Sequence, residues 1–191
     1  MPRLFIALDL PSEVKQQLLQ LPRAYSGARW QSLEQLHLTL VFIGDVDKSQ
    51  VPELLEALKQ VHAEPLHLSL KGVGYFGSAR YPRVLFAEVE KNPALNKLQK
   101  QVFNALAGLG LDLEKRKYHP HVTLARLERT PYESVGQFLE TEALFKTDSF
   151  HLEQFHLYSS RQTRTGSEYR IESSFPLKTG YSAESLERTE F

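Results

Sequence analysis

His37-Leu38-Thr39-Leu40 and His121-Val122-Thr123-Leu124 are two tetrapeptides of the same form, and they decide the expected fold. Side chains of a β-strand alternate between its two faces, so a histidine and a threonine two residues apart share one face. With seven histidines in 191 residues, chance predicts roughly a third of one His-x-Thr sequence. The two copies therefore predict two strands, each with an imidazole and a hydroxyl on one face and apolar residues on the other.

The sequence around each motif predicts the same order of elements: strand, helix, motif strand, helix, strand. In the first half we expect these elements at 4–10, 12–21, 36–43, 51–62 and 66–70. In the second half we expect them at 84–89, 93–107, from 121 onward, at 132–139 and at 150–158, followed by a last strand at 169–177. His121 lies 84 positions after His37, and His151 lies 84 positions after His67. This register indicates an internal repeat.

Two copies of a long unit are too few for a solenoid. They predict an α+β fold of two pseudo-symmetric lobes, each with an antiparallel sheet and helices, and an active-site cleft between the sheets. We expect one bilobal domain over 1–177, with lobe halves of roughly 1–80 and 81–177. Within it, 159–167 is expected to be a loop, and 178–191 a flexible tail.

Composition and charge exclude several classes of protein. The chain has no cysteine, so it can form no disulfide, thiolate metal site or thiol nucleophile. Its 23 basic and 23 acidic side chains balance, so no overall field draws it onto duplex nucleic acid. No apolar run approaches the roughly 20 residues that span a bilayer, and the run at 4–8 is too short for a secretory signal. We therefore expect a soluble, cytoplasmic protein with no membrane role.

Two facing imidazoles can divide the work of acid–base catalysis, because one can accept a proton while the other donates one. In-line attack of water on a cyclic phosphodiester needs a base beside the water and an acid on the opposite side of phosphorus. Thr39 and Thr123 share faces with the histidines and can donate to phosphate oxygens. No metal or cofactor is needed if a guanidinium also meets the charge of the transition state.

Arg126 is the candidate for that guanidinium, five residues after His121. A regular strand would place it on the opposite face, so this role requires a β-bulge, strong twist or a long reach. Phe42 stands at the equivalent position of the first half. Phe42, Tyr118 and Trp30 are candidates for stacking on a base, and the basic run 115–117 for steering an RNA strand.

Three stretches carry a resemblance to a known family: Arg3-Leu4-Phe5-Ile6-Ala7, the segment 36–44 and the segment 118–126. They resemble the two-histidine phosphoesterase superfamily, and within it the RNA 2′,3′-cyclic phosphodiesterases, also known as 2′-5′ RNA ligases. The resemblance implies a bilobal α+β fold and metal-independent hydrolysis of an RNA-terminal 2′,3′-cyclic phosphate to a 2′-phosphomonoester.

The resemblance also implies roles for single residues. His37 matches the general acid that protonates the departing 3′ oxygen, and His121 matches the base that activates water. Thr39 and Thr123 match the phosphate clamps, and Arg126 matches the arginine that follows the second motif. The implied ligand is RNA with a 2′,3′-cyclic phosphate end or a small cyclic nucleotide, with no protein partner.

Several alternatives stay open at this point. The same acid–base pair would serve 2′-5′ linked oligonucleotides, small cyclic nucleotides or 2′-5′ ligation of RNA, and a non-catalytic RNA-end binding module is a further hypothesis. His119 and His121 suggest a metal site less strongly, because Pro120 separates them and no third ligand is near in sequence. His67 and His151 are expected on outer strand faces.

Overall fold

The structure, a computed structural model, describes residues 3–23, 25–164 and 166–178. The α-helices are α1 Ser12–Leu19, α2 Val51–Lys59, α3 Pro93–Ala107 and α4 Tyr132–Thr141, and the short 3₁₀ helices are η1 Leu33–Gln35 and η2 Lys48–Gln50. The strands are β1 Arg3–Asp9, β2 Ala28–Trp30, β3 His37–Asp45, β4 Leu66–Leu68, β5 Leu70–Gly77, β6 Pro82–Val89, β7 His121–Leu127, β8 Phe150–Leu152, β9 Gln154–Thr163 and β10 Gly166–Pro176.

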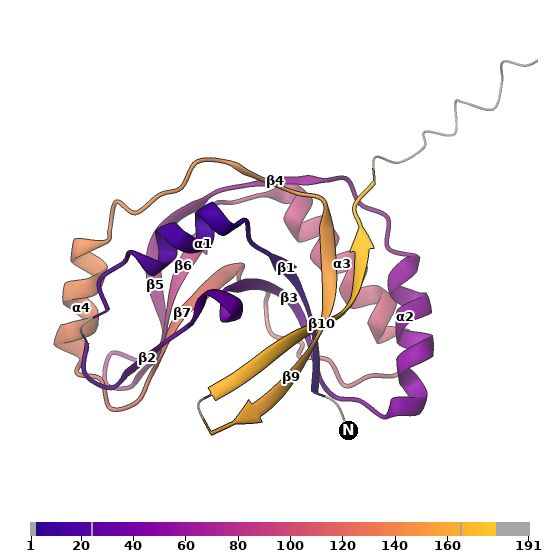
Figure 1. Cartoon of the computed structure of the whole chain (residues 1–191), viewed down its shortest axis with the longest axis horizontal. Helices are drawn as coiled ribbons and strands as arrows, with labels where there is room; N and C mark the ends of the chain where they lie inside the picture. The colour runs from indigo at the N-terminus through magenta and orange to yellow at the C-terminus, as the bar shows by residue number, and fades with distance from the viewer. Residues whose placement is uncertain (1–2, 24, 165, 179–191) are drawn as a thin grey trace, which may run out of the picture.

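The main sheet is antiparallel and has the strand order β10-β9-β1-β3-β7-β6-β5, with β2 paired to β7. Its two arms meet where β3 pairs with β7, and the one residue pair in that ladder is Leu38 with Val122. Figure 1 shows β1, β3, β9 and β10 on one side of this junction and β5, β6 and β7 on the other. The predicted α+β class with antiparallel sheets is confirmed, and the two expected sheets are joined into one.

The internal repeat is visible in two strand pairings. Leu38 lies opposite Val122 in the main sheet, and His67 lies opposite His151 in the small sheet of β4 and β8. In both pairs the partners are 84 positions apart in sequence. Equivalent residues that face each other across an antiparallel pair are related by a local two-fold axis, so both pairings have the symmetry expected of an internal repeat.

The two arms do not coincide with the chain halves 1–80 and 81–177. β9 and β10 come from the second half, but β9 pairs onto β1 and β10 onto β9, whereas β2 and β5 come from the first half but pair onto β7 and β6. Helix α3, from the second half, packs against β3. Each arm therefore contains strands from both halves, because strand partners are chosen by long-range packing and not by position along the chain.

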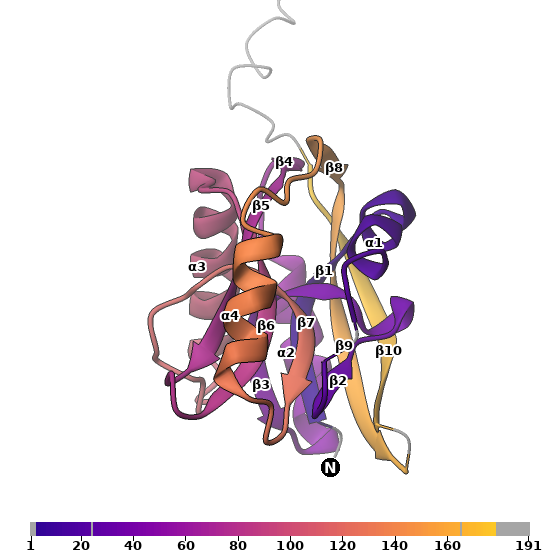
Figure 2. The same cartoon turned by 90° about the vertical axis from the view of Figure 1, so that its left-hand side faces the viewer.

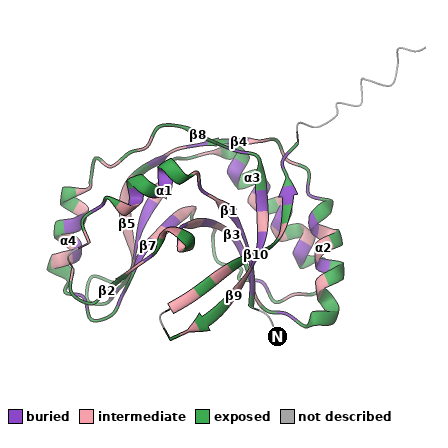
Figure 3. Cartoon of the chain, viewed as in Figure 1, coloured by how far each residue is buried: buried purple, intermediate pink, exposed green. Residues whose placement is uncertain are grey.

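Helix α3 illustrates how local sequence sets an element. Asn92 accepts a hydrogen bond from the backbone N–H of Leu95 at 2.9 Å, and Pro93 occupies the first turn, where its missing N–H costs nothing. One stripe of the helix is fully buried: Leu95, Leu98, Val102 and Leu106. Burying each such side chain contributes about 1.5–3 kcal/mol. Figure 3 shows buried and exposed residues alternating along α2 and α3, as expected for helices that cover a sheet.

The loop expected at 159–167 was a wrong prediction, because the described part of this segment forms the ends of β9 and β10. Their pairing continues out to Thr163 opposite Gly166, and Figure 2 shows the two strands side by side as a long ribbon. Most residues near the turn are exposed or only partly buried. A ribbon that projects beyond the core has no apolar face, so its sequence lacks the alternation that indicates a strand.

Strand β5 was also missed, because its three glycines resemble a loop sequence.

Among the described helices, none is long and apolar enough to cross a membrane. The predicted flexible tail at 178–191 lies outside the described residues except for Lys178.

Candidate functional site

Arg126 reaches the same face as His121 through a β-bulge in β7. Thr123 and Ala125 pair with consecutive residues of β6, so Leu124 is the extra residue of the bulge. Leu124 and Ala125 are both buried and Arg126 is exposed. The bulge shifts the alternation by one residue, which is the geometry that the role of Arg126 required.

Strand β3 carries the same bulge at the equivalent place. Thr39 and Val41 pair with consecutive residues of β1, which leaves Leu40 as the extra residue. Leu40 and Val41 are buried, and Phe42 is 43% exposed. Phe42 therefore lies on the same face of β3 as Thr39. In the second arm, Arg126 lies on the same face of β7 as Thr123.

The two motif strands line one cavity of about 260 Å³. Seven of the site residues predicted from the sequence belong to its lining: His37, Thr39, Phe42, Tyr118, His121, Thr123 and Arg126. From the basic run 115–117, Arg116 and Lys117 also line the cavity. The structure thus brings together residues that are 84 positions apart in sequence.

Each motif histidine makes the same kind of hydrogen bond, from Nδ1 to the backbone carbonyl two residues before it. Nδ1 of His37 lies 2.7 Å from the carbonyl oxygen of Gln35, and Nδ1 of His121 lies 2.7 Å from that of His119. A carbonyl can only accept, so Nδ1 carries the proton and donates it in both rings. In the neutral ring, Nε2 then holds the lone pair and is the atom that can accept a proton.

The hydroxyl of Thr39 lies 3.1 Å from Nε2 of His37. Because Nε2 of the neutral ring is an acceptor, the hydroxyl donates to it. A protonated ring would reverse this bond, since Nε2–H would then donate and the hydroxyl hydrogen would be released for another acceptor. Protonation of His37 is therefore linked to the hydrogen bonding of Thr39.

Burial shifts the titration of both histidines. The pKa of His37 falls to about 4, mainly because burial disfavours its charged form, with a smaller lowering from the charge of His121. The carbonyl of Gln35 and the carboxylate of Asp9 partly oppose this shift. The pKa of His121 is also lowered, mainly by burial. Both rings are neutral at pH 7, and an anion bound beside them would raise their pKa values.

Aromatic rings pack around His37 and shield part of the ring from water. The centre of its ring lies 4.9 Å from that of Phe5 and 6.0 Å from that of Tyr158, and Tyr169 presents its ring at nearly a right angle at 5.2 Å. These contacts orient the imidazole and account for its desolvation.

His121 has its own aromatic surroundings, from Phe76 at 4.8 Å and Phe86 at 5.3 Å between ring centres. The ring of Phe86 crosses the backbone of Gly74, where a Cβ atom would lie 2.6 Å from its Cζ atom. Glycine at this position therefore allows Phe86 to lie beside the histidine.

Tyr118 contributes differently from the predicted stacking. Its hydroxyl donates to the carbonyl oxygen of Thr39 at 3.2 Å, and burial raises its pKa. Tyr118 thus connects the segment before β7 to the first motif strand. Phe42 is the more open ring, stacked on Phe5 at 5.6 Å between centres and exposed on its other side.

Apart from the two motif histidines, the histidines either lie outside this cavity or have, within the part of the chain that the structure describes, too few neighbouring ligands to form a metal site. His67 and His151 are exposed on β4 and β8, with Nε2 of His67 3.1 Å from Nδ1 of His151. Among the described residues, no three His, Cys, Asp or Glu side chains are grouped so that they could hold a metal ion.

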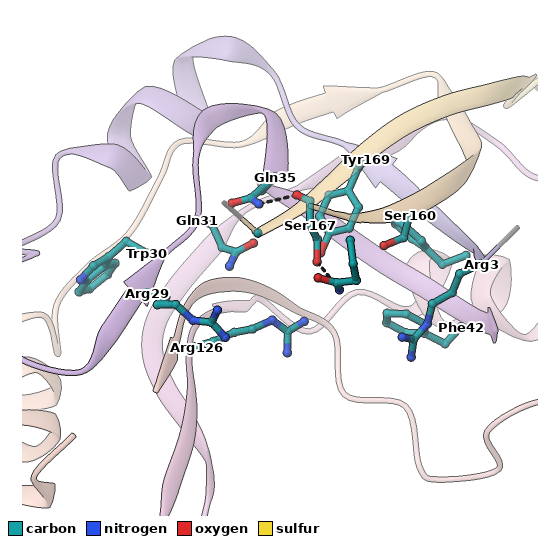
Figure 4. Close-up of a pocket in the computed structure, with 13 residues that line it drawn as sticks. Arg3, Arg29, Trp30, Gln31, Gln35, Phe42, Arg126, Ser160, Ser167 and Tyr169 are labelled. Atoms are coloured by element: carbon teal, nitrogen blue, oxygen red, sulfur yellow. Dashed lines mark hydrogen bonds between the residues drawn. The ribbon is translucent and has the colours of Figure 1, made fainter. Parts of the chain in front are cut away.

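A second cavity of about 320 Å³ adjoins the first and shares Gln31, Phe42, Arg126 and Tyr169 with it. Figure 4 shows Arg29 and Arg126 side by side, with Arg3 on the opposite side next to Phe42. Arg29 was missed in the sequence because β2, which carries it, has only three residues. Trp30 lies in this second cavity.

Residues 8–86 and 88–169 match the family described as LigT like phosphoesterase. The chain is 35% identical over 175 residues to the RNA 2′,3′-cyclic phosphodiesterase of Thermotoga maritima, and the match covers 88% of this chain and 92% of that protein. It is 30% identical over 166 residues to the RNA 2′,3′-cyclic phosphodiesterase of Bacillus subtilis, and this match covers 83% of this chain and 91% of that protein.

Solved structures show the same fold. The protein TT0787 of Thermus thermophilus superposes with a TM-score of 0.78 at 28% identity, over 92% of this chain and 98% of that one. LigT of E. coli, solved with 3′-AMP, superposes with a TM-score of 0.75 at 24% identity, over 94% of this chain and 100% of that one.

Proposed function

Because the chain belongs to the LigT-like phosphoesterase family, we propose that it hydrolyses the 2′,3′-cyclic phosphate at the end of an RNA to a 2′-phosphomonoester. One observation carries this proposal: two His-x-Thr strands line one cavity, and each imidazole has its Nδ1 proton held by a backbone carbonyl. Relatives named RNA 2′,3′-cyclic phosphodiesterase support the choice of substrate.

The reaction needs one proton acceptor and one proton donor. Nε2 of His121 takes a proton from water as its oxygen bonds to phosphorus. The bond from phosphorus to the 3′ oxygen then breaks, and Nε2–H of His37 gives its proton to that oxygen. The products are a 2′-phosphomonoester and a 3′ hydroxyl, and the two histidines exchange protons with water to restore the starting state.

His37 must be protonated for this role, although burial lowers its pKa to about 4. A phosphodiester carries a negative charge, and such a charge beside Nε2 favours the imidazolium form. Protonation also releases the hydroxyl of Thr39 from Nε2. Substrate binding would therefore charge the acid and free a hydrogen-bond donor for the phosphate in one step.

Side chains of the protein stabilise the negative charge on the phosphate oxygens. The hydroxyls of Thr39 and Thr123 donate to the two non-bridging oxygens, and the guanidinium of Arg126 faces the charge that grows on them. Phe42 offers a face on which the terminal base can stack. Tyr118 holds the carbonyl of Thr39 and so positions the first motif strand.

The test uses a short RNA with a 2′,3′-cyclic phosphate end, incubated with the protein in EDTA and followed by ³¹P NMR. We expect a 2′-phosphomonoester as the product. His37→Ala and His121→Ala should each lose about 10²–10⁴-fold in rate. His67→Ala is the matched control, because this strand histidine lies in the small sheet, and it should retain full activity.

Cyclic ends that stay closed would contradict the proposal, as would equal losses in all three variants. Parallel incubations with 2′-5′ linked oligoadenylate, small cyclic nucleotides and RNA halves test the related activities. A cytoplasmic location also belongs to the proposal, and cell fractionation tests it.

A further inference from the structure

We propose that the second cavity, here called the arginine chamber and defined by Arg3, Arg29 and Arg126, binds the phosphodiester that joins the last two nucleotides of the substrate. The protein would then select oligonucleotide ends over single nucleotides. This inference rests on the proposed function and adds the part of the substrate that lies outside the catalytic cavity.

The arginine chamber has the charge expected of a phosphate site. Three guanidinium groups line it, and none of the described residues in its lining carries a carboxylate. Its other lining groups are aromatic rings, amides and hydroxyls, among them Gln31 and Ser160. Planar guanidinium groups with neutral donors beside them match the oxygens of a phosphodiester.

The strand register supplies an independent observation. Arg29 on β2 lies directly opposite Arg126 on β7, and Figure 4 shows both side chains extending in the same direction. Like charges directly opposite each other destabilise a strand pair. Glu128 contacts Arg29 at 2.5 Å and offsets part of this repulsion. Among the described residues Arg126 forms no ion pair, so an anion between the two guanidinium groups would remove the remaining repulsion.

The chamber also has a defined wall and a defined route to the reacting phosphate. Gln35 donates to the carbonyl oxygen of Ser167 at 2.6 Å and so holds the β9–β10 ribbon against η1. Tyr169 on this ribbon contacts the ring of His37. An RNA end with its base on Phe42 would pass from the catalytic cavity into the chamber, because Phe42 lines both.

A third cavity, of about 520 Å³, offers a competing route: it shares Phe76, Val84 and Arg116 with the catalytic cavity, and Arg83 also lines it. It has two guanidinium groups, and that of Arg116 already contacts Glu114 at 3.4 Å. In the arginine chamber Arg29 is likewise paired, with Glu128, but among the described residues Arg3 and Arg126 form no ion pair, so the chamber is the stronger anion site. Arg83 precedes the core residues of β6 as Arg3 precedes those of β1, so it provides a matched control.

The experiment compares three substrates under one condition: adenosine 2′,3′-cyclic phosphate, the dinucleotide ApA with a 2′,3′-cyclic phosphate end, and the same dinucleotide with an uncharged methylphosphonate linkage. We expect kcat/KM for the charged dinucleotide to exceed both other values by about tenfold or more. Arg3→Gln and Arg29→Gln should remove this advantage and leave turnover of the mononucleotide unchanged, whereas Arg83→Gln should keep the advantage.

Equal kcat/KM for the charged and uncharged dinucleotides would overturn the inference, and so would loss of the advantage in Arg83→Gln alone. If none of the three substrates is opened, the proposed function fails. The chamber is then judged by calorimetric titration of the same three compounds onto the wild-type protein. Tighter binding of the charged dinucleotide supports the chamber, and equal affinities overturn it.

Discussion

At the scale of single residues, the candidate site consists of two imidazoles with the same hydrogen-bonded tautomer and different surroundings. His37 lies among Phe5, Tyr158 and Tyr169, whereas His121 lies beside Phe76, with Arg116 near enough for its charge to affect the ring. Different environments give two like groups different proton affinities, and burial lowers the pKa of His37 to about 4.

The lowered pKa of His37 gives a direct test of its link to substrate charge. In the free protein, NMR titration of the ring protons should give a midpoint of about 4. Saturation with adenosine 2′-phosphate should raise this midpoint, because the phosphate stabilises the imidazolium. Titration of His121 in the same spectra is the internal comparison. An unchanged midpoint for His37 with ligand bound would contradict its role as the acid.

At the scale of elements, the two motif strands work because each contains a bulge one residue after its threonine. The bulges turn Phe42 and Arg126 onto the face that carries the histidines. Strand β5 contributes through Gly74, whose missing side chain makes room for Phe86 beside His121. The cavity thus depends on irregularities of the strands as much as on their regular pairing.

Gly74→Ala tests this packing. The new Cβ atom would lie 2.6 Å from Phe86, so the ring must move, at a cost of about 1–3 kcal/mol of stability. Because Phe86 packs on His121, kcat/KM should fall as well. Gly136→Ala in α4 is the control, since a Cβ atom there meets nothing within 4 Å and alanine should stabilise the helix by about 0.5–1 kcal/mol. Denaturant unfolding and kinetics of both variants provide the measurement, and an unaffected Gly74→Ala protein would refute this account.

At the scale of the whole molecule, each arm contains strands from both halves of the chain, and the strand pairing between the arms consists of one residue pair, Leu38 with Val122. This junction lies between the histidine and threonine of each motif, so it sets how the two halves of the site face each other. The β9–β10 ribbon extends the first arm and adds a wall to the arginine chamber. The shape of the site is therefore a property of the assembled arms.

Burial of the uncharged His37 should make the folded protein sensitive to acid. The unfolded chain binds a proton at this residue near its ordinary pKa of 6.5, whereas the folded protein binds it only near 4. Stability is present above pH 6.5 and is lost as the pH falls toward 4, by at most about 3 kcal/mol from this group. In urea unfolding at pH 7 and pH 4.5, His37→Gln should lose less stability than the wild type. Equal losses would show that another group causes the sensitivity.

The sequence by itself determined the two motif strands, helix α3, the 84-residue repeat and the set of seven residues that line one cavity. Alternation of apolar side chains, helix capping and repeated motifs are local signals, and these can be read from neighbouring residues. The tertiary structure alone decided that β9 pairs onto β1 and β10 onto β9, that the described part of 159–167 belongs to the β9–β10 ribbon, and that Arg29 lies opposite Arg126. Strand partners depend on contacts between distant residues, so no local pattern could reveal them.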